Sequence, residues 1–228
     1  MIILVRHGEA THHTEHLTGG WTDSELTAAG CAQIEIVAAK LVLDLAGKNA
    51  NWRILSSDLK RARASAEILA AALPQHRDVE PCVFLREKNN GQAAGLTETA
   101  AKKLFCPPPT DTEIDHRNYP GGETRREFYQ RTLQGLSQKA DWEQENLLIV
   151  AHKGTIQNII FAWLGLDMDQ VRAQHVSVDV LPASVSVLGI NKWGEHALFL
   201  LNAQPLAPAY GYGLTKFKMI KVDENRTK

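Results

Sequence analysis

The chain has 228 residues, of which 44% are hydrophobic, and a formal net charge of −1 from 25 basic and 26 acidic side chains. This is enough to bury one sizeable core, and the balanced charge argues against binding to nucleic acid through phosphate neutralisation. The cysteines, Cys31, Cys82 and Cys106, form no CxxC pair and indicate a reducing compartment. Because residues 1–5 are too short for a signal peptide, and no run approaches the roughly 18 residues of a membrane span, we expect a cytoplasmic protein that binds no membrane.

Strands and helices alternate in the first 85 residues. Continuous apolar runs predict strands buried on both faces, and apolar residues spaced three and four apart predict helices. In chain order the predicted elements are a strand at 2–5, a helix introduced by Leu26-Thr27 and ended by Gly47, a strand at 52–55, a helix capped by Ser57 or Asp58 and ended by Pro74, and a strand at 79–85.

The second half continues the alternation after a loop-rich stretch from residue 86 to 120, which we interpret as an insertion over the sheet. The later elements are a helix that follows Gly121-Gly122-Glu123 and runs to about Trp142, a strand at 146–151, a helix at about 155–164, and strands at 176–190 and 197–201. This order predicts an α/β fold, a three-layer sandwich with a mostly parallel central sheet and helices on both faces. We expect residues 1–228 to form a single domain with a cap insertion at about 88–120, and a homodimer is left open.

Polar side chains follow four of the predicted strands. The segments are Arg6-His7-Gly8-Glu9, Ser56-Ser57-Asp58-Leu59-Lys60-Arg61-Ala62, Leu85-Arg86-Glu87 and His152-Lys153-Gly154. Because ligands bind at the carboxyl ends of the strands in such folds, two guanidiniums, two imidazoles and one carboxyl group should share a pocket.

That set of groups suits a phosphate monoester. Guanidinium groups present a planar, permanently charged fork to phosphate oxygens, and a neutral imidazole can attack phosphorus and hold the group covalently. Helix N-termini after Arg61 and His152 would add backbone N–H donors. Glu87 is the carboxyl group at these strand ends that is placed to protonate a leaving alkoxide.

Five segments, which include or adjoin these residues, resemble the motifs of the histidine phosphatase superfamily, which includes cofactor-dependent phosphoglycerate mutases and many small-molecule phosphatases. In order, the similar segments are RHGE at 6–9, SSDLKRA at 56–62, LRE at 85–87 with Gly91 and the GLT at 95–97, PGGET at 120–124, and VAH at 150–152. Any one of them could arise by chance, but five in order are specific.

The resemblance implies a role for each matching residue. His7 would be the phosphorylated nucleophile, and Glu87 the acid that later activates water. Arg6, Arg61 and His152 would clamp the transferring phosphoryl group, while Gly20 and the amide of Lys153 would lie at the rim. The mechanism needs no metal or organic cofactor.

The sequence departs from the family pattern at three places. His13 replaces a common Asn, Gln92-Ala93-Ala94 replaces an acidic-aromatic-acidic triplet, and Lys153 replaces a Gly. Each change alters the part of the pocket that contacts the substrate beyond its phosphate group. We therefore do not infer the substrate from that of a relative. Lys153 and His13 suggest a second anionic group on it.

The expected function is therefore that of a phosphomonoester phosphatase acting on a small phosphorylated metabolite. The alternatives are a phosphoglycerate mutase-type phosphoryl transfer and a catalytically inactive protein that binds a phosphorylated ligand.

His12, Glu15 and His16 also match the His-x-x-Glu-His pattern of zinc peptidases. That chemistry needs a firm helix and a third ligand, whereas this segment lacks the periodicity of a core helix, so we predict a polar loop without metal.

Overall fold

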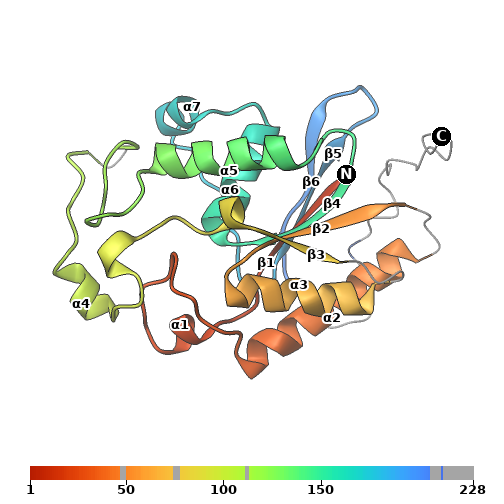
Figure 1. The fold of residues 1–228 in the computed structure, drawn as a ribbon. Coiled ribbons are helices and arrows are strands. Elements are labelled where there is room, and N and C mark those ends of the chain that lie inside the picture. The colour runs from red at the N-terminus through yellow and green to blue at the C-terminus, as the bar shows by residue number, and fades with distance from the viewer. Residues whose placement is uncertain (47–49, 74–77, 111–112, 206–211, 213–228) are drawn as a thin grey trace.

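A six-stranded sheet lies at the centre of the computed structural model, which describes residues 1–46, 50–73, 78–110, 113–205 and 212 (Figure 1). The strands are β1 (Ile2–Arg6), β2 (Trp52–Ser57), β3 (Val79–Cys82), β4 (Asn146–Ala151), β5 (Val185–Ile190) and β6 (His196–Ala203). Their order in the sheet is β3-β2-β4-β1-β5-β6. The β1, β2, β3 and β4 strands run parallel, and β5 is antiparallel to both β1 and β6. The predicted mostly parallel sheet is confirmed.

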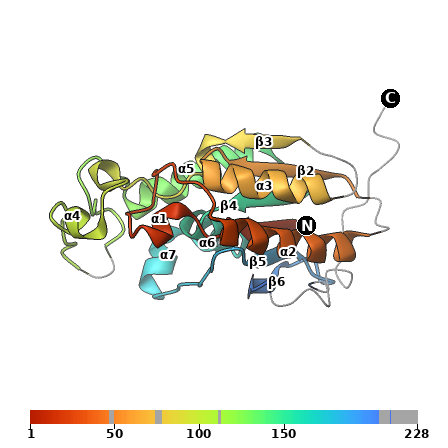
Figure 2. The same cartoon turned by 90° about the horizontal axis from the view of Figure 1, so that it is seen from below.

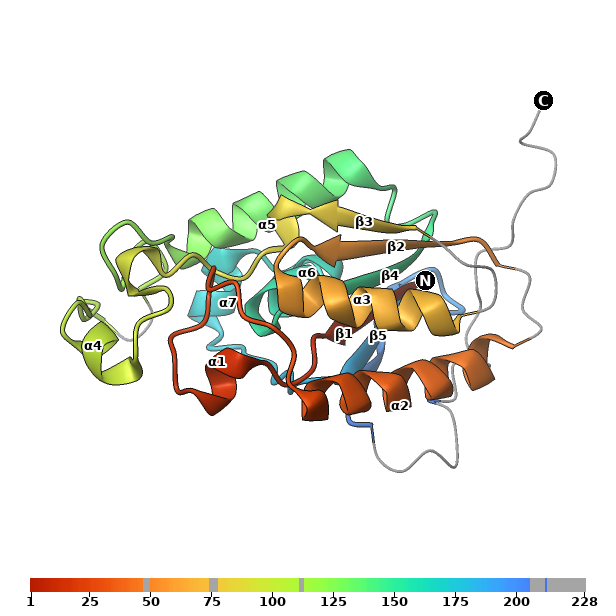
Figure 3. The same ribbon diagram turned by 60° about the horizontal axis from the view of Figure 1, so that its bottom comes forward.

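Helices cover both faces of this sheet. They are α1 (Thr11–Thr14), α2 (Ala28–Leu45), α3 (Lys60–Ala72), α4 (Glu98–Lys102), α5 (Arg125–Lys139), α6 (Lys153–Trp163) and α7 (Met168–Ala173), with short 3₁₀ turns η1 (Val83–Leu85) and η2 (Gly91–Ala93). Figure 3 shows α2 and α3 side by side on one face, and Figure 1 shows α5 and α6 on the other. The result is the expected three-layer arrangement.

The pleat of β1 explains why its sequence is apolar throughout. Ile3 and Val5 belong to the core cluster that includes residues of α2 and α3, whereas Ile2 and Leu4 belong to the cluster that includes residues of α6. Successive side chains of a strand point to opposite faces, and both faces are covered here, so alternation with polar residues is lost.

Three strand and helix ends differ from the prediction. The third strand ends at Cys82 and continues as η1, and Pro81 is tolerated there because β3 lies at the edge of the sheet. The predicted strand at 176–190 begins only at Val185, after a turn that contains Pro182 and in which Ala183 has φ +56°. The helix predicted to run to about 142 ends at Lys139, where the chain becomes extended at Ala140.

Helix starts also differ. The cap of α3 is Leu59, whose own side chain makes no capping bond; Ser57 Oγ accepts from the Leu59 amide, and Asp23 accepts the Lys60 amide. The α7 helix was not predicted, although a capping box of Asp167 and Gln170 marks its start. The predicted stop residues Gly47 and Pro74 lie outside the described residues.

The segment between η1 and α5, which carries η2 and α4, lies beyond the carboxyl ends of the parallel strands and not over a face of the sheet (Figure 2). The α1 turn lies at the same end of the molecule. Among the described residues, no helix has the length and apolar character required to cross a membrane.

Candidate active site

Two histidines meet where β1 and β4 end. The register pairs Arg6 with Ala151, so the next residue of each strand, His7 and His152, emerges at the same level of the sheet. The His7 amide donates to the Ala151 carbonyl at 3.1 Å, and the ring centroids of His7 and His152 lie 5.1 Å apart. Both side chains are buried. Two imidazoles at this separation are close enough to contact one phosphate group.

The hydrogen bonds of His7 fix the position of its ring proton. Nδ1 lies 2.7 Å from the Gly8 carbonyl, which can only accept, so the proton resides on Nδ1. Nε2 accepts from Nε of Arg61 at 3.3 Å. Burial, followed by the nearby His152, Arg61 and Arg6, lowers the pKa of His7 well below its ordinary value. His7 is therefore a neutral imidazole whose Nε2 lone pair faces a guanidinium.

Gly8 permits the close approach that holds His7 in place. A Cβ at position 8 would lie 2.4 Å from the Gly30 carbonyl oxygen, and a Cβ at Gly30 would lie 2.0 Å from the Glu9 carbonyl oxygen. The start of α2 therefore packs directly on the backbone that follows His7. Any side chain at position 8 would displace the carbonyl that orients His7.

Arg61 is buried at 1% exposure in the first turn of α3. Its Nη2 donates to the Gly20 carbonyl at 2.8 Å, and its Nη1 donates to the Thr22 carbonyl. With His7 Nε2, its closest acceptors are thus neutral. Burial lowers the pKa of Arg61 to about 10, which still leaves it charged at neutral pH. Gly20, predicted at the rim, is placed where its carbonyl orients Arg61.

Arg6 is the second cation beside His7. Its Nη1 donates to the Val180 carbonyl at 2.6 Å, which ties β1 to the chain that leads into β5. Its Nε is buried and has no hydrogen-bond partner among the described residues. Burial lowers the pKa of Arg6 from its ordinary value, while Glu87 opposes that shift.

His13 lies against both His7 and Arg6. Its ring stacks on His7 with centroids 5.7 Å apart and planes 13° apart, and its Nδ1 accepts from the Ala10 amide at 3.1 Å. The neutral ring therefore carries its proton on Nε2, which lies 3.4 Å from Nη2 of Arg6. Burial, then Arg6 and Arg61, lowers the pKa of His13 to about 4. Two donors thus face each other, an arrangement that a shared anionic acceptor would satisfy.

A fourth imidazole completes what we call the histidine cluster, His7, His12, His13 and His152. His12 bonds to Ser24 Oγ at 2.7 Å, and burial, with His13 as the next cause, lowers its pKa to about 3. The segment predicted as a loop contains the helical turn α1, and His16 beyond it is exposed with φ +52°. Within the described residues, His, Cys, Asp and Glu side chains form no group suited to hold a metal ion.

Glu87 is held at the start of α6. Its Oε1 accepts from the Lys88 amide at 2.8 Å and its Oε2 from the Gly154 amide at 3.0 Å. The Glu87 carbonyl accepts from Trp21 Nε1 at 2.8 Å and from Arg131 Nη2 at 3.1 Å. The carboxyl group and its backbone are therefore both fixed.

Lys153 lies farther out than the other predicted site residues. Its Nζ donates to Asp179 at 2.7 Å, and the two side chains are 48% and 58% exposed. An exposed pair of this kind contributes little to stability, so it can open to a competing anion.

The sequence prediction omitted three residues that contact the predicted site residues. Ser57 contacts His152, Arg131 reaches the Glu87 carbonyl from α5, and Asp179 pairs with Lys153. Ser57 lies within the SSDLKRA segment, and its place in that motif is a sequence signal that could have pointed to a role at the site. Arg131 and Asp179 have none, because only the packing of α5 and of the chain before β5 brings them to the site.

Known proteins share this sequence pattern. The histidine phosphatase superfamily (branch 1) model matches residues 2–203. Phosphoglycerate mutase-like protein 4 of Arabidopsis thaliana is 32% identical over 166 residues, which cover 69% of this chain and 68% of the relative. The 2,3-bisphosphoglycerate-dependent phosphoglycerate mutase of Nitrobacter winogradskyi is 26% identical over 190 residues, which cover 78% of this chain and 87% of the relative.

Solved structures share the fold at lower identity. The α-ribazole phosphatase of Shigella flexneri aligns with a TM-score of 0.69 and 23% identity, over 89% of this chain and 96% of that one. A mycobacterial glucosyl-3-phosphoglycerate phosphatase aligns with a TM-score of 0.67 and 23% identity, over 89% of this chain and 98% of that one. With a family model that spans nearly the whole described chain, the protein belongs to branch 1 of the histidine phosphatase superfamily.

Proposed function

We propose that this protein is a phosphomonoester phosphatase that acts on a small phosphorylated metabolite through a phosphohistidine at His7. The observation that carries the proposal is the bond between Arg61 and the unprotonated Nε2 of His7. It places a nucleophilic lone pair beside a buried cation whose other hydrogen bonds also go to neutral acceptors. A phosphate group would provide the anionic acceptor, together with an electrophile for Nε2.

In the first step, Nε2 of His7 attacks phosphorus and the bond from phosphorus to the ester oxygen breaks. The leaving oxygen takes a proton from the carboxyl group of Glu87. Nδ1 keeps its proton throughout, and the Gly8 carbonyl stabilises the positive charge that develops on the ring. The products are the released alcohol, a phosphorylated His7 and ionised Glu87.

In the second step, Glu87 takes a proton from water as the water oxygen attacks phosphorus. The bond from phosphorus to Nε2 breaks, its electron pair returns to the ring, and inorganic phosphate leaves. Glu87 is again protonated and His7 is again neutral, so the cycle is balanced.

Arg6, Arg61 and His152 would bind the phosphoryl oxygens in both steps. The facing donors of Arg6 and His13, and the unpartnered Nε of Arg6, are the groups that an anion would satisfy. Loss of one such donor costs about a hundredfold or more in the rate of related reactions.

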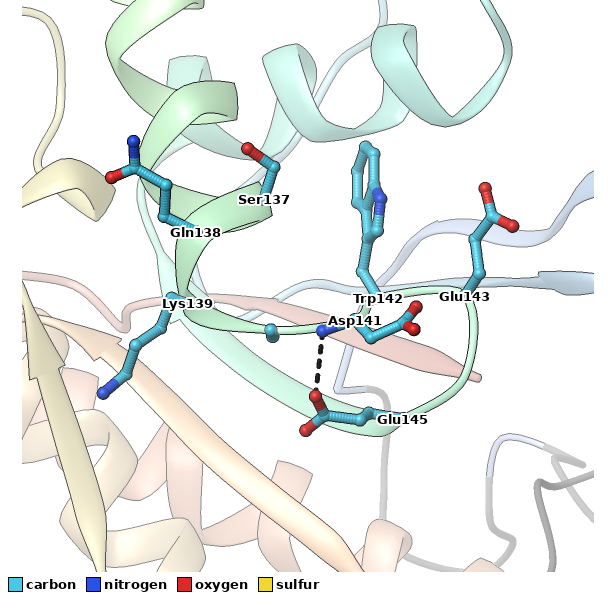
Figure 4. A pocket seen from close by; sticks show the side chains of 8 residues that line it. Ser137, Gln138, Lys139, Asp141, Trp142, Glu143 and Glu145 are labelled. Carbon is cyan, nitrogen blue, oxygen red and sulfur yellow. Dashed lines mark hydrogen bonds between the residues drawn. The ribbon is translucent and has the colours of Figure 1, made fainter.

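Another pocket, of about 450 Å³, lies at the opposite end of the parallel strands, around the connection from α5 to β4 (Figure 4). Asp141, Glu143 and Glu145 line it, with Lys139 as its cation. Three carboxylates would repel a phosphate dianion, so this pocket does not compete with the histidine cluster as the site.

Phosphate release from a panel of phosphorylated metabolites tests the proposal, with His7→Ala as the inactive variant and His16→Ala, an exposed histidine, as the matched control. We expect turnover and an acid-labile phosphohistidine in the native protein and in His16→Ala, and neither in His7→Ala.

Two results would oppose the proposal. A phosphoryl group that returns to substrate or stays as a bisphosphate would identify a mutase. Binding of phosphorylated ligands with no turnover on any substrate, including p-nitrophenyl phosphate, would identify an inactive binding protein.

A further inference from the structure

His152 has one hydrogen-bond partner for its ring within the described residues. Its Nε2 lies 2.8 Å from Oγ of Ser57, the last residue of β2, and both side chains are buried at 1% exposure or less. Its Nδ1 is buried and has no partner among the described residues. The ring thus has one nitrogen with a hydrogen-bond partner and one nitrogen, Nδ1, without a partner among the described residues.

The direction of the bond to Ser57 follows from the other contact of the hydroxyl. Ser57 Oγ already accepts from the Leu59 amide at 3.3 Å. In the described part of the chain, His152 Nε2 is the acceptor within reach of the hydroxyl proton. If His152 donated instead, the buried Ser57 proton would have no acceptor, which is the costlier arrangement. Ser57 therefore donates, and Nε2 carries the lone pair.

The ring proton of neutral His152 must then be on Nδ1. Burial, with Arg61 and Arg6 as the next causes, lowers the pKa of His152 well below its ordinary value, which keeps the ring neutral. A neutral imidazole has one donor and one acceptor nitrogen. Nδ1–H is consequently the donor that His152 can offer to an anion beside His7.

We propose that Ser57 is a positioning residue that fixes the tautomer of His152, so that Nδ1–H donates to an oxygen of the transferring phosphoryl group. In the other tautomer, a lone pair would face that oxygen and repel it. The proposal rests on the proposed function for its catalytic consequence, but the tautomer itself is a property of the free protein.

The chain offers a matched control for Ser57. Ser56 is the preceding residue of β2, is equally buried, and donates its hydroxyl to the Ser57 carbonyl at 2.8 Å without contact to the histidine cluster. Ser57→Ala and Ser56→Ala therefore remove the same atom from the same strand. Ser57→Thr keeps the hydroxyl and tests for rescue.

The tautomer is measured by ¹⁵N–¹H NMR of the histidine rings in the free protein, and again with orthovanadate as the probe. We expect Nδ1–H at His152 in the native protein and in Ser56→Ala, and a substantial Nε2–H population in Ser57→Ala. An Nε2–H signal at His152 in the native protein would overturn the proposal. This measurement on the native protein stands even if a variant fails to fold.

Kinetics provide the second readout. Ser57→Ala should lower kcat/KM about 10- to 100-fold, and Ser56→Ala less than about threefold, with Ser57→Thr recovering most of the loss. Equal losses in the two alanine variants, with an unchanged tautomer, would assign Ser57 a structural role only. A native protein with no turnover and no phosphohistidine would refute the proposed function, while the tautomer measurement would still decide the role of Ser57.

Discussion

Gly154 lies so close to Glu87 that even a Cβ at position 154 would force a neighbouring side chain to move. A Cβ at position 154 would lie 2.4 Å from Glu87 Oε1 and 2.8 Å from a ring carbon of Phe128, and the Gly154 amide donates to Oε2 at 3.0 Å. The second residue of α6 must therefore be small for the proposed general acid to reach the helix start.

Gly154→Ala should displace Glu87 and impair protonation of the leaving group. We expect kcat/KM, which reports the steps up to release of the alcohol, to fall about 100-fold for an alkyl phosphate but less than about tenfold for 2,4-dinitrophenyl phosphate, whose leaving group needs no proton. Steady-state kinetics on both substrates measure the difference. Equal losses on both would indicate general disruption of the site and count against Glu87 as the acid.

Arg131 holds the chain that carries Glu87. It donates to the carbonyls of Phe84 and Glu87 and pairs with Glu123, and the side chains of that pair are 21% and 16% exposed. Arg131→Met should lower the free energy of unfolding by roughly 2 kcal/mol and show the same leaving-group dependence as Gly154→Ala. Urea denaturation and the two substrates above provide the measurements.

Arg63→Met is the control for Arg131, because its pair with Glu67 is 59% and 55% exposed. It should cost less than about 1 kcal/mol and leave the kinetics unchanged. If Arg131→Met behaved in the same way, the carbonyl contacts would have no part in holding Glu87.

The histidine cluster should make the protein sensitive to acid. Burial lowers the pKa of His13 to about 4 and of His12 to about 3, and it lowers the pKa values of His7 and His152 well below 6.5. Below about pH 6.5 the unfolded chain binds protons at these rings and the folded chain does not. The free energy of unfolding therefore falls as pH falls, by about 1.4 kcal/mol per pH unit for each ring that stays neutral.

Urea denaturation between pH 8 and pH 5 measures this slope. His13→Asn should reduce it, because one buried titrating ring is removed. His175→Asn should not, since His175 is exposed, and its φ of +52° suits Asn. A native protein equally stable at pH 8 and pH 5 would contradict the neutral state of the cluster.

The pair between Lys153 and Asp179 should control the response to a second anionic group on the substrate. Asp179→Asn frees Lys153 and should raise kcat/KM about two- to fivefold for substrates with such a group, whereas Lys153→Gly should lower it by a similar factor. Substrates with a single phosphate group should respond to neither change. Identical kinetics for Lys153→Gly on all anionic substrates would exclude the role.

The sequence by itself determined the alternation of elements, the buried strands and the family. The apolar run at residues 2–5 and the polar segments after the strands are local signals, and the register of β1 on β4 then brings His7 and His152 together. Those signals are strong because a buried parallel strand must be apolar and a ligand must bind where such strands end.

Only the tertiary structure decided which atoms carry protons and which residues hold the reactive groups in place. The tautomers of His7 and His152 follow from a carbonyl and a hydroxyl whose directions are set by packing. Arg131 reaches Glu87 across 44 residues of sequence, with no pattern around either that marks the contact. Hydrogen-bond direction depends on where neighbouring acceptors lie in space, and the order of residues along a chain does not specify that position.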